Sequence, residues 1–263
     1  MIRTTGRDCL AEAVRSVYAQ RFDGRVQILI GVDKGNFSLD ALGTLFHEDC
    51  PANMAVSVFD PGYSTAARNG GMYSNGCGGA LLAILAFLAN APRLINLDDD
   101  NRIRPDHLAA LTTALGDKAW AYSLRWFTNP VGYEPICIDR WESVGPGRGA
   151  YAGKFGGHVD MNSWMIDKRR LHRLIPAFTR SMFADGAGED RVMFGLLKGL
   201  PHGETNMATS DYVISPNDQN HAQRLGWFRA EGYDVDRIPR AVAGNALGAG
   251  YHGATDTGVR DAG

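Results

Sequence analysis

The sequence lacks the features that mark several large classes of protein. Its four cysteines are scattered without a CxxC pair, so it predicts neither a disulfide framework nor a zinc site, and the thiols are those of a reduced, cytoplasmic protein. The net charge is −2 and no basic stripe stands out, which argues against nucleic acid as the main partner. The longest apolar stretch, residues 78–88, is too short to span a bilayer, and no signal peptide precedes it. We therefore expect a cytoplasmic protein that meets a membrane peripherally at most.

The composition that is present favours one globular unit. The chain has 263 residues, of which 44% are hydrophobic and 21% charged, and this is enough to bury a full core. Its first half alternates between two kinds of pattern. Apolar runs at residues 26–32, 54–59 and 94–97 predict strands, and residues 8–20, 39–46 and 107–115 have helical periodicity. Residues 63–90 are predicted to be mostly helix, interrupted at Gly70-Gly71 and Gly76. Strands and helices in strict turn predict a parallel, three-layer α/β sheet.

The pattern changes in the second half of the chain. Residues 119–127 and 134–141 are aromatic-rich strand candidates, and residues 145–157 form a loop with six glycines. Helices are expected near residues 168–179 and from about residue 188. We expect a single domain over residues 1–243, with halves at 1–116 and 117–243, and a flexible tail over 244–263.

The most informative local feature is a run of three carboxylates, Asp98, Asp99 and Asp100, directly after an apolar strand and shortly before Pro105. The carboxyl ends of strands are where open α/β sheets bind their ligands. Three adjacent carboxylates repel one another in a poorly solvated cleft unless a cation lies among them. A hard ion such as Mg²⁺ or Mn²⁺, shared with a phosphate, suits them, whereas the plain alternative is a solvated strand-to-helix turn.

Four further motifs follow predicted strands or begin predicted helices: Arg3-Thr4-Thr5-Gly6-Arg7, Val32-Asp33-Lys34-Gly35, Ala66-Ala67-Arg68-Asn69 and Gly188-Glu189-Asp190-Arg191. With Leu97-Asp98-Asp99-Asp100-Asn101 they stand in the order and spacing typical of one family. Over residues 2–200 the sequence resembles the family 2 glycosyltransferases. The resemblance implies a GT-A fold: a Rossmann-like, mostly parallel central sheet flanked by helices, with a smaller β/α region on the acceptor side. Residues 1–116 would then bind the nucleotide, and residues 117–243 the acceptor.

The resemblance also implies a donor site. It assigns nucleotide contacts to Thr4, Thr5, Arg7, Asp33, Arg68, Asp98 and Asp99. Asp98 and Asp100 would hold Mn²⁺ or Mg²⁺, and the ion would act as a Lewis acid on the departing diphosphate. His221 is the candidate third ligand, with His158, His202 and His252 as competitors and a solvated loop histidine as the plain alternative. UDP is the commonest carrier in the family and the favoured donor, with GDP and dTDP open. The plain alternatives are a helix cap for the threonines, a turn for Asp33 and a surface position for Arg68.

The acceptor side of the resemblance rests on the start of the last predicted helix. Asp190 matches the carboxylate that deprotonates the acceptor hydroxyl or amine, so that one inversion at the anomeric carbon follows. Glu189 and Trp164 would line the sugar subsite. Alternatively, Glu189 and Asp190 complement a helix dipole, and Trp164 packs in the core.

Other functions for this pattern are weaker. A phosphatase places its Asp-x-Asp motif on the first strand, whereas in this chain other predicted strands and helices precede the strand that ends at Asp98. A nucleotidyltransferase expects a glycine-rich, basic loop where Thr4-Thr5-Gly6-Arg7 stands. A non-catalytic sugar-nucleotide-binding module would not need both Asp100 and Asp190.

Overall fold

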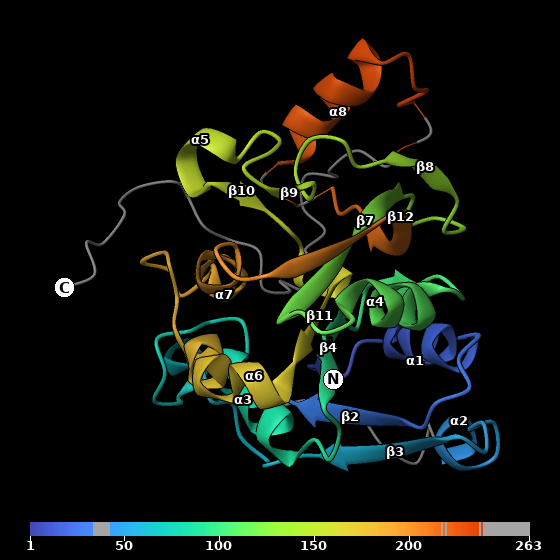
Figure 1. The fold of residues 1–263 in the computed structure, drawn as a ribbon, viewed down its shortest axis with the longest axis vertical. Coiled ribbons are helices and arrows are strands. Elements are labelled where there is room, and N and C mark those ends of the chain that lie inside the picture. The colour runs from blue at the N-terminus through green and yellow to red at the C-terminus, as the bar shows by residue number, and fades with distance from the viewer. Residues whose placement is uncertain (34–42, 217, 219, 237, 239–263) are drawn as a thin grey trace.

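The computed structural model describes residues 1–33, 43–216, 218, 220–236 and 238, with only the backbone of Arg68 (Figure 1). Half of the helix expected over 39–46, residues 39–42, lies outside these residues, and α2 (Gly43–His47) covers the other half. The tail at 244–263 and the side chain of Arg68 also lie outside the described residues. No helix of the described chain is both long and apolar enough to cross a membrane.

A four-stranded parallel sheet, in the order β3-β2-β1-β5, forms the N-terminal half of the fold. Its strands are β1 (Ile2–Thr4), β2 (Val26–Val32), β3 (Met54–Phe59) and β5 (Leu97–Asp98). Alternate residues of β2 point to opposite faces. Ile28 and Ile30 pack with the core of helix α1 (Leu10–Tyr18), and Leu29 packs with that of α3 (Gly79–Leu88). The predicted α/β class, a parallel central sheet between helices, is therefore confirmed.

A second, mixed sheet of six strands lies beside the first, in the order β4-β11-β7-β12-β6 with β8 paired to β7. Its strands are β4 (Arg93–Ile95), β6 (Arg102–Ile103), β7 (Trp120–Thr128), β8 (Pro135–Ile138), β11 (Trp164–Asp167) and β12 (His202–Val213). Strands β7 and β12 run parallel, and the other pairs are antiparallel. Helix α4 (His107–Leu115) packs against β7, β11 and β12.

The remaining elements surround this second sheet. They are η3 (Met161–Ser163), α6 (Lys168–Leu171), η4 (His172–Thr179), α7 (Glu189–Leu197) and α8 (His221–Ala230). The glycine-rich segment predicted as a loop contains β9 (Gly145–Pro146), α5 (Ala152–Phe155) and β10 (Gly157–His158), of which β9 and β10 form an antiparallel pair.

Two predictions about chain organisation are corrected. The segment 63–90 is helical mainly from Gly79 onward, apart from the single turn η2 (Ala67–Asn69), because Gly70 and Gly78 adopt left-handed backbone angles that interrupt a helix. The strand expected at 94–97 is two strands that separate at Asn96. Strand β4 pairs with the second sheet and β5 with the first, so this segment carries the chain from one sheet to the other.

Candidate active site

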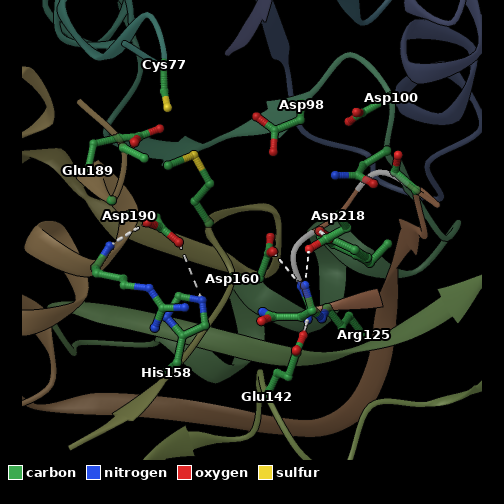
Figure 2. A pocket seen from close by; sticks show the side chains of 18 of the residues that line it. Cys77, Asp98, Asp100, Arg125, Glu142, His158, Asp160, Glu189, Asp190 and Asp218 are labelled. Carbon is green, nitrogen blue, oxygen red and sulfur yellow. Dashed lines mark hydrogen bonds and ion pairs between the residues drawn. The ribbon is translucent and has the colours of Figure 1, made fainter. Parts of the chain in front are cut away.

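A cavity lies where the carboxyl end of β5, the start of α7 and the β7–β12 region meet (Figure 2). Asp98 and Asp100 line it from the β5 side, and Glu189 and Asp190 from the first turn of α7. Tyr151 and His158 line it from the glycine-rich segment, and Arg125, Glu142, Asp160, Asp218 and Arg224 also contribute. Segments about ninety residues apart in the sequence therefore place their carboxylates around one cavity.

The three consecutive aspartates have different surroundings. Asp98 accepts a hydrogen bond from Asn162 Nδ2 at 2.8 Å and pairs with Arg3 Nη2 at 3.2 Å. Asp100 pairs with Arg7 Nη1 at 2.8 Å. Asp99 is only 2% exposed, and it accepts a 2.6 Å bond from Thr4 Oγ1 and pairs closely with Arg7. Asp98 and Asp100 thus reach the cavity, while Asp99 anchors the β1 loop beneath it.

Arg3 connects the two acidic groups of the cavity. Strands β1 and β5 pair in parallel, and their register places Arg3 beside Asp98. Arg3 Nη1 lies 2.6 Å from Glu189 Oε1 and also donates to the carbonyl of Cys77. Glu189 is 3% exposed; burial raises its pKa, the neighbouring charge of Asp190 adds to this, and Arg3 opposes it. Glu189 is therefore committed to Arg3.

Asp190 is more accessible, with 29% of its side chain exposed. The backbone N–H of Arg191 donates to its Oδ1 at 2.7 Å, and His158 Nε2 lies 3.5 Å from its Oδ2. Burial lowers the pKa of His158 to about 3, and the charge of Arg191 contributes, so the imidazole is neutral at physiological pH. His158 therefore lies beside the Asp190 carboxylate as a neutral imidazole and restricts its orientation.

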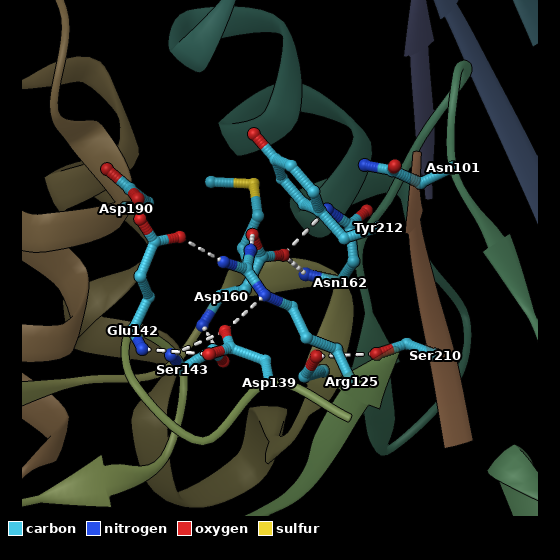
Figure 3. Close-up of polar contacts among 12 residues, drawn as sticks. Asn101, Arg125, Asp139, Glu142, Ser143, Asp160, Asn162, Asp190, Ser210 and Tyr212 are labelled. Atoms are coloured by element: carbon cyan, nitrogen blue, oxygen red, sulfur yellow. Dashed lines mark hydrogen bonds and ion pairs between the residues drawn. The ribbon is translucent and has the colours of Figure 1, made fainter. Parts of the chain in front are cut away.

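A network of buried ions forms the base of the cavity (Figure 3). Arg125, 3% exposed, pairs with Asp139 at 2.8 Å and with Glu142 and Asp160 at 2.6 Å each. Arg224 pairs with Glu142 as well, at 2.8 Å. Burial alone would raise the pKa of Asp139, but Arg125 and three backbone N–H donors lower it below its ordinary value. The network fixes β7 and the glycine-rich segment around the cavity.

The structure does not bring every predicted residue to this cavity. Asp33 is 2% exposed at the end of β2 and accepts a 3.3 Å bond from Thr65 N, and Thr5 lies exposed in the loop after β1. His221, the first residue of α8, is buried next to Asn220, which lines the cavity. Trp164 is fully buried in the core with Trp120 and is not among the residues that line this cavity.

The structure gives three residues roles that the sequence did not predict, although Arg3 stands in the first motif and His158 was an alternative metal ligand. Arg3 and His158 contact the acidic residues directly, and Arg125 organises the base of the cavity. For Arg125, the sequence does contain one indication: it is a charged residue in an aromatic-rich predicted strand, between Tyr122 and Phe127. In the structure Arg125 is buried, as are most residues of this strand. A buried charge in a strand requires charged partners.

The donor atoms at the β5 end suit a hard divalent cation. Asp98 and Asp100 present carboxylate oxygens to one cavity, and oxygen ligands are those that Mg²⁺ and Mn²⁺ prefer. Within the described residues no three histidine, cysteine or acidic side chains are grouped closely enough to hold a metal by themselves. Asp98 and Asp100 alone would therefore not complete the coordination of a cation, which would need further ligands such as phosphate, water or another side chain.

Comparison with known proteins identifies related folds. No family model matches the sequence, and no curated protein matches it. Among solved structures, TarS from S. aureus superposes with a TM-score of 0.56 at 12% identity, over 90% of this chain and 40% of that one. Its 1–349 fragment, solved with UDP-GlcNAc, gives 0.55 at 11% identity over 90% and 67% of the two chains. Mannosyltransferase PcManGT from Pyrobaculum calidifontis, solved with GDP-Man and Mn²⁺, gives 0.52 at 12% identity over 85% and 58%. The chain spans less than two thirds of full-length TarS and of PcManGT, and at these identities the likeness establishes the fold.

Proposed function

We propose that the protein transfers a sugar from a nucleotide-diphosphate donor, with UDP favoured, to an acceptor hydroxyl or amine, with inversion at the anomeric carbon. The observation that carries the proposal is the convergence of Asp98, Asp100 and Asp190 on one cavity. Support comes from the fold, since one protein of similar fold was solved with UDP-GlcNAc and another with GDP-Man and Mn²⁺.

The donor nucleotide would lie along the carboxyl ends of β1, β2 and β5. Asp33, which follows β2, would accept hydrogen bonds from the base, and Thr4, Thr5 and Arg7 would contact the nucleotide from the end of β1 and the loop after it. Asp99 contributes by holding Thr4 and Arg7, to which it is bonded. The role assigned to Arg68, contact with a phosphate, stays part of the proposal.

Asp98 and Asp100 would hold Mn²⁺ or Mg²⁺, with His221 as the candidate third ligand. The bound ion would supply Lewis-acid neutralisation of the charge that develops on the leaving diphosphate. The chain's own contribution is to hold both carboxylates at the cavity, which Arg3, Arg7 and Asn162 do through direct contacts.

Asp190 would act as the general base. It accepts the proton of the acceptor hydroxyl while the acceptor oxygen forms its bond to the anomeric carbon and the bond from that carbon to the diphosphate oxygen breaks. Glu189 is less suited because Arg3 occupies its carboxylate. Glu189 would instead support the donor-sugar side of the cavity through Arg3, and His158 would hold Asp190 in orientation.

The test compares turnover with binding. Donor hydrolysis and transfer are measured with UDP- and GDP-sugars in the presence of Mn²⁺, for the wild type, Asp190→Asn and the control Asp117→Asn, which changes an exposed carboxylate after α4. Loss of a general base costs roughly 10²–10⁴-fold in rate. We expect this loss for Asp190→Asn only, with unchanged nucleotide binding.

Binding is followed by the thermal midpoint, which a ligand of the folded state raises. We expect UDP and Mn²⁺ together to raise it more than either alone. Full turnover by Asp190→Asn would refute the base assignment. A wild type that gains stability from UDP and Mn²⁺ but never turns over any donor would be a sugar-nucleotide-binding module instead.

A further inference from the structure

Two large apolar side chains are exposed together at the end of α3, away from the cavity. Phe87 is 58% exposed and Leu88 is 54% exposed, although the preceding residues of this helix are largely buried. Exposed single apolar residues are common, but two neighbours of this size beside a charged cluster require an explanation.

The charged cluster is basic. The exposed or partly exposed cations Arg93, Lys168, Arg169, Arg170 and Arg173 lie on β4, α6 and the start of η4, together with His172. The side chains of Arg169 and Arg170 are 72% and 57% exposed. Asp167 is the one acid of segment 167–173, and it pairs with Arg169 at 2.9 Å and with Arg170 at 3.9 Å. One carboxylate therefore offsets only part of this positive charge.

The apolar and basic groups form one surface. Lys168 Nζ donates to the carbonyls of Phe87 at 3.2 Å and Ala89 at 2.6 Å, and Lys168 N donates to Pro92 O. A shallow groove between residues 89–92 and Lys168, Arg169 and His172 joins the two segments. Figure 1 shows α3 and α6 side by side on the same side of the molecule. We call Phe87, Leu88, Arg93, Lys168, Arg169, Arg170, His172 and Arg173 the α3–α6 patch.

We propose that the α3–α6 patch docks the protein on the surface of an anionic lipid bilayer. Clustered Lys and Arg side chains are attracted to anionic headgroups, and adjacent exposed apolar side chains insert at the boundary between headgroups and acyl chains. A nucleic acid would satisfy the cations but would leave Leu88 without a favourable environment. The lipid surface accounts for both halves of the patch.

Docking through this patch leaves the cavity accessible. Helix α3 begins next to Cys77, which lines the cavity, and the patch lies at the other end of its ten residues. A helix of that length spans about 15 Å. Membrane binding and nucleotide binding are therefore separable properties, and the proposal does not depend on the proposed function.

The test is sedimentation of the full chain with vesicles of phosphatidylcholine, alone or mixed with phosphatidylglycerol. We expect binding to the anionic vesicles only, weakened by salt. Arg170→Gln/Arg173→Gln should lower the partition coefficient by about fivefold for each cation removed. Phe87→Ala/Leu88→Ala should lower it as well. The matched control, Arg15→Gln/Arg21→Gln, removes two exposed arginines of 56% and 76% side-chain exposure from the α1 region and should bind like the wild type.

Three results would overturn the proposal. In the first, the wild type does not sediment with anionic vesicles. In the second, the patch variants bind these vesicles as well as the control does. In the third, the wild type prefers an RNA oligonucleotide to anionic vesicles, and Phe87→Ala/Leu88→Ala does not change its RNA binding. Thermal midpoints close to that of the wild type verify that each variant is folded. Because no turnover is measured, a failure here is distinct from a failure of the proposed transferase activity.

Discussion

Replacing Arg125 with methionine tests the ion network at the base of the cavity. Methionine approximates the length of the arginine chain but leaves Asp139, Glu142 and Asp160, which are 2.6–2.8 Å from the guanidinium, without that partner. Removing one member of a buried ion pair costs about 3–5 kcal/mol, because the other charge stays buried. With three carboxylates affected, we expect the upper part of this range in the free energy of unfolding at neutral pH, measured by urea denaturation.

The control for this prediction is Arg15→Met. Arg15 lies 2.7 Å from Glu12, but the side chains are 56% and 40% exposed, so its loss should cost at most about 0.5 kcal/mol. The pH dependence gives a second check. The pKa of Asp139 is depressed in the folded state, so its stabilisation exists above its unfolded pKa and is lost as the pH falls. The gap between wild type and Arg125→Met should therefore shrink in acid. A cost below about 1 kcal/mol, or a gap that widens on acidification, would refute the reasoning.

Two further predictions concern buried side chains. Trp164→Ala should destabilise the fold by about 3–5 kcal/mol but leave the affinity for nucleotide unchanged, because Trp164 packs in the core. Denaturation measures the first quantity and isothermal titration the second. A large loss of affinity in a folded variant would indicate that Trp164 contributes to the site. Burial lowers the pKa of both His107 and His158 to about 3. Their stabilisation is complete above the unfolded pKa near 6.5 and is lost below it, so the free energy of unfolding should fall from pH 6.5 to 5 with a limiting slope of about 1.4 kcal/mol per pH unit for each histidine. A flat profile over that window would contradict this.

The parts of the fold that could be predicted are those in which local pattern and tertiary environment agree. The continuous apolar run 26–32 is β2, and residues 54–59 and 107–115 are β3 and α4 with the predicted bounds. Asn96 shows where the pattern is insufficient. The apolar segment around it reads as one strand, but its two halves pair with different sheets, and only the partners of each half determine that separation.

The candidate site likewise contains some residues that sequence motifs indicated and others that only the tertiary structure reveals. The grouping of Asp98, Asp100 and Asp190 was implied by a family resemblance, because each residue stands in a motif with a fixed position relative to a strand or helix. The contacts of His158 with Asp190 and of Arg3 with Glu189 have no such local signature. His158 belongs to a glycine-rich segment whose path depends on Gly145 and Gly157, both with positive φ and both too crowded for a Cβ atom. The basic segment 168–173 is too short to indicate a binding surface from the sequence, and Arg93 joins it only through the pairing of β4 with β11.

The charge of the cavity supports the proposal that a cation binds there. Among the described residues that line it are seven acidic side chains and four arginines. The arginines of the base are already shared among the carboxylates of the network, and Arg3 is held between Asp98 and Glu189. A nucleoside diphosphate that enters such a cavity adds negative charge where negative charge is already in excess, and this repulsion is strong in a poorly solvated site. In the proposed function, a divalent ion at Asp98 and Asp100 would neutralise these two carboxylates at the β5 end and attract the diphosphate, while Asp190 would serve as the base at the α7 end.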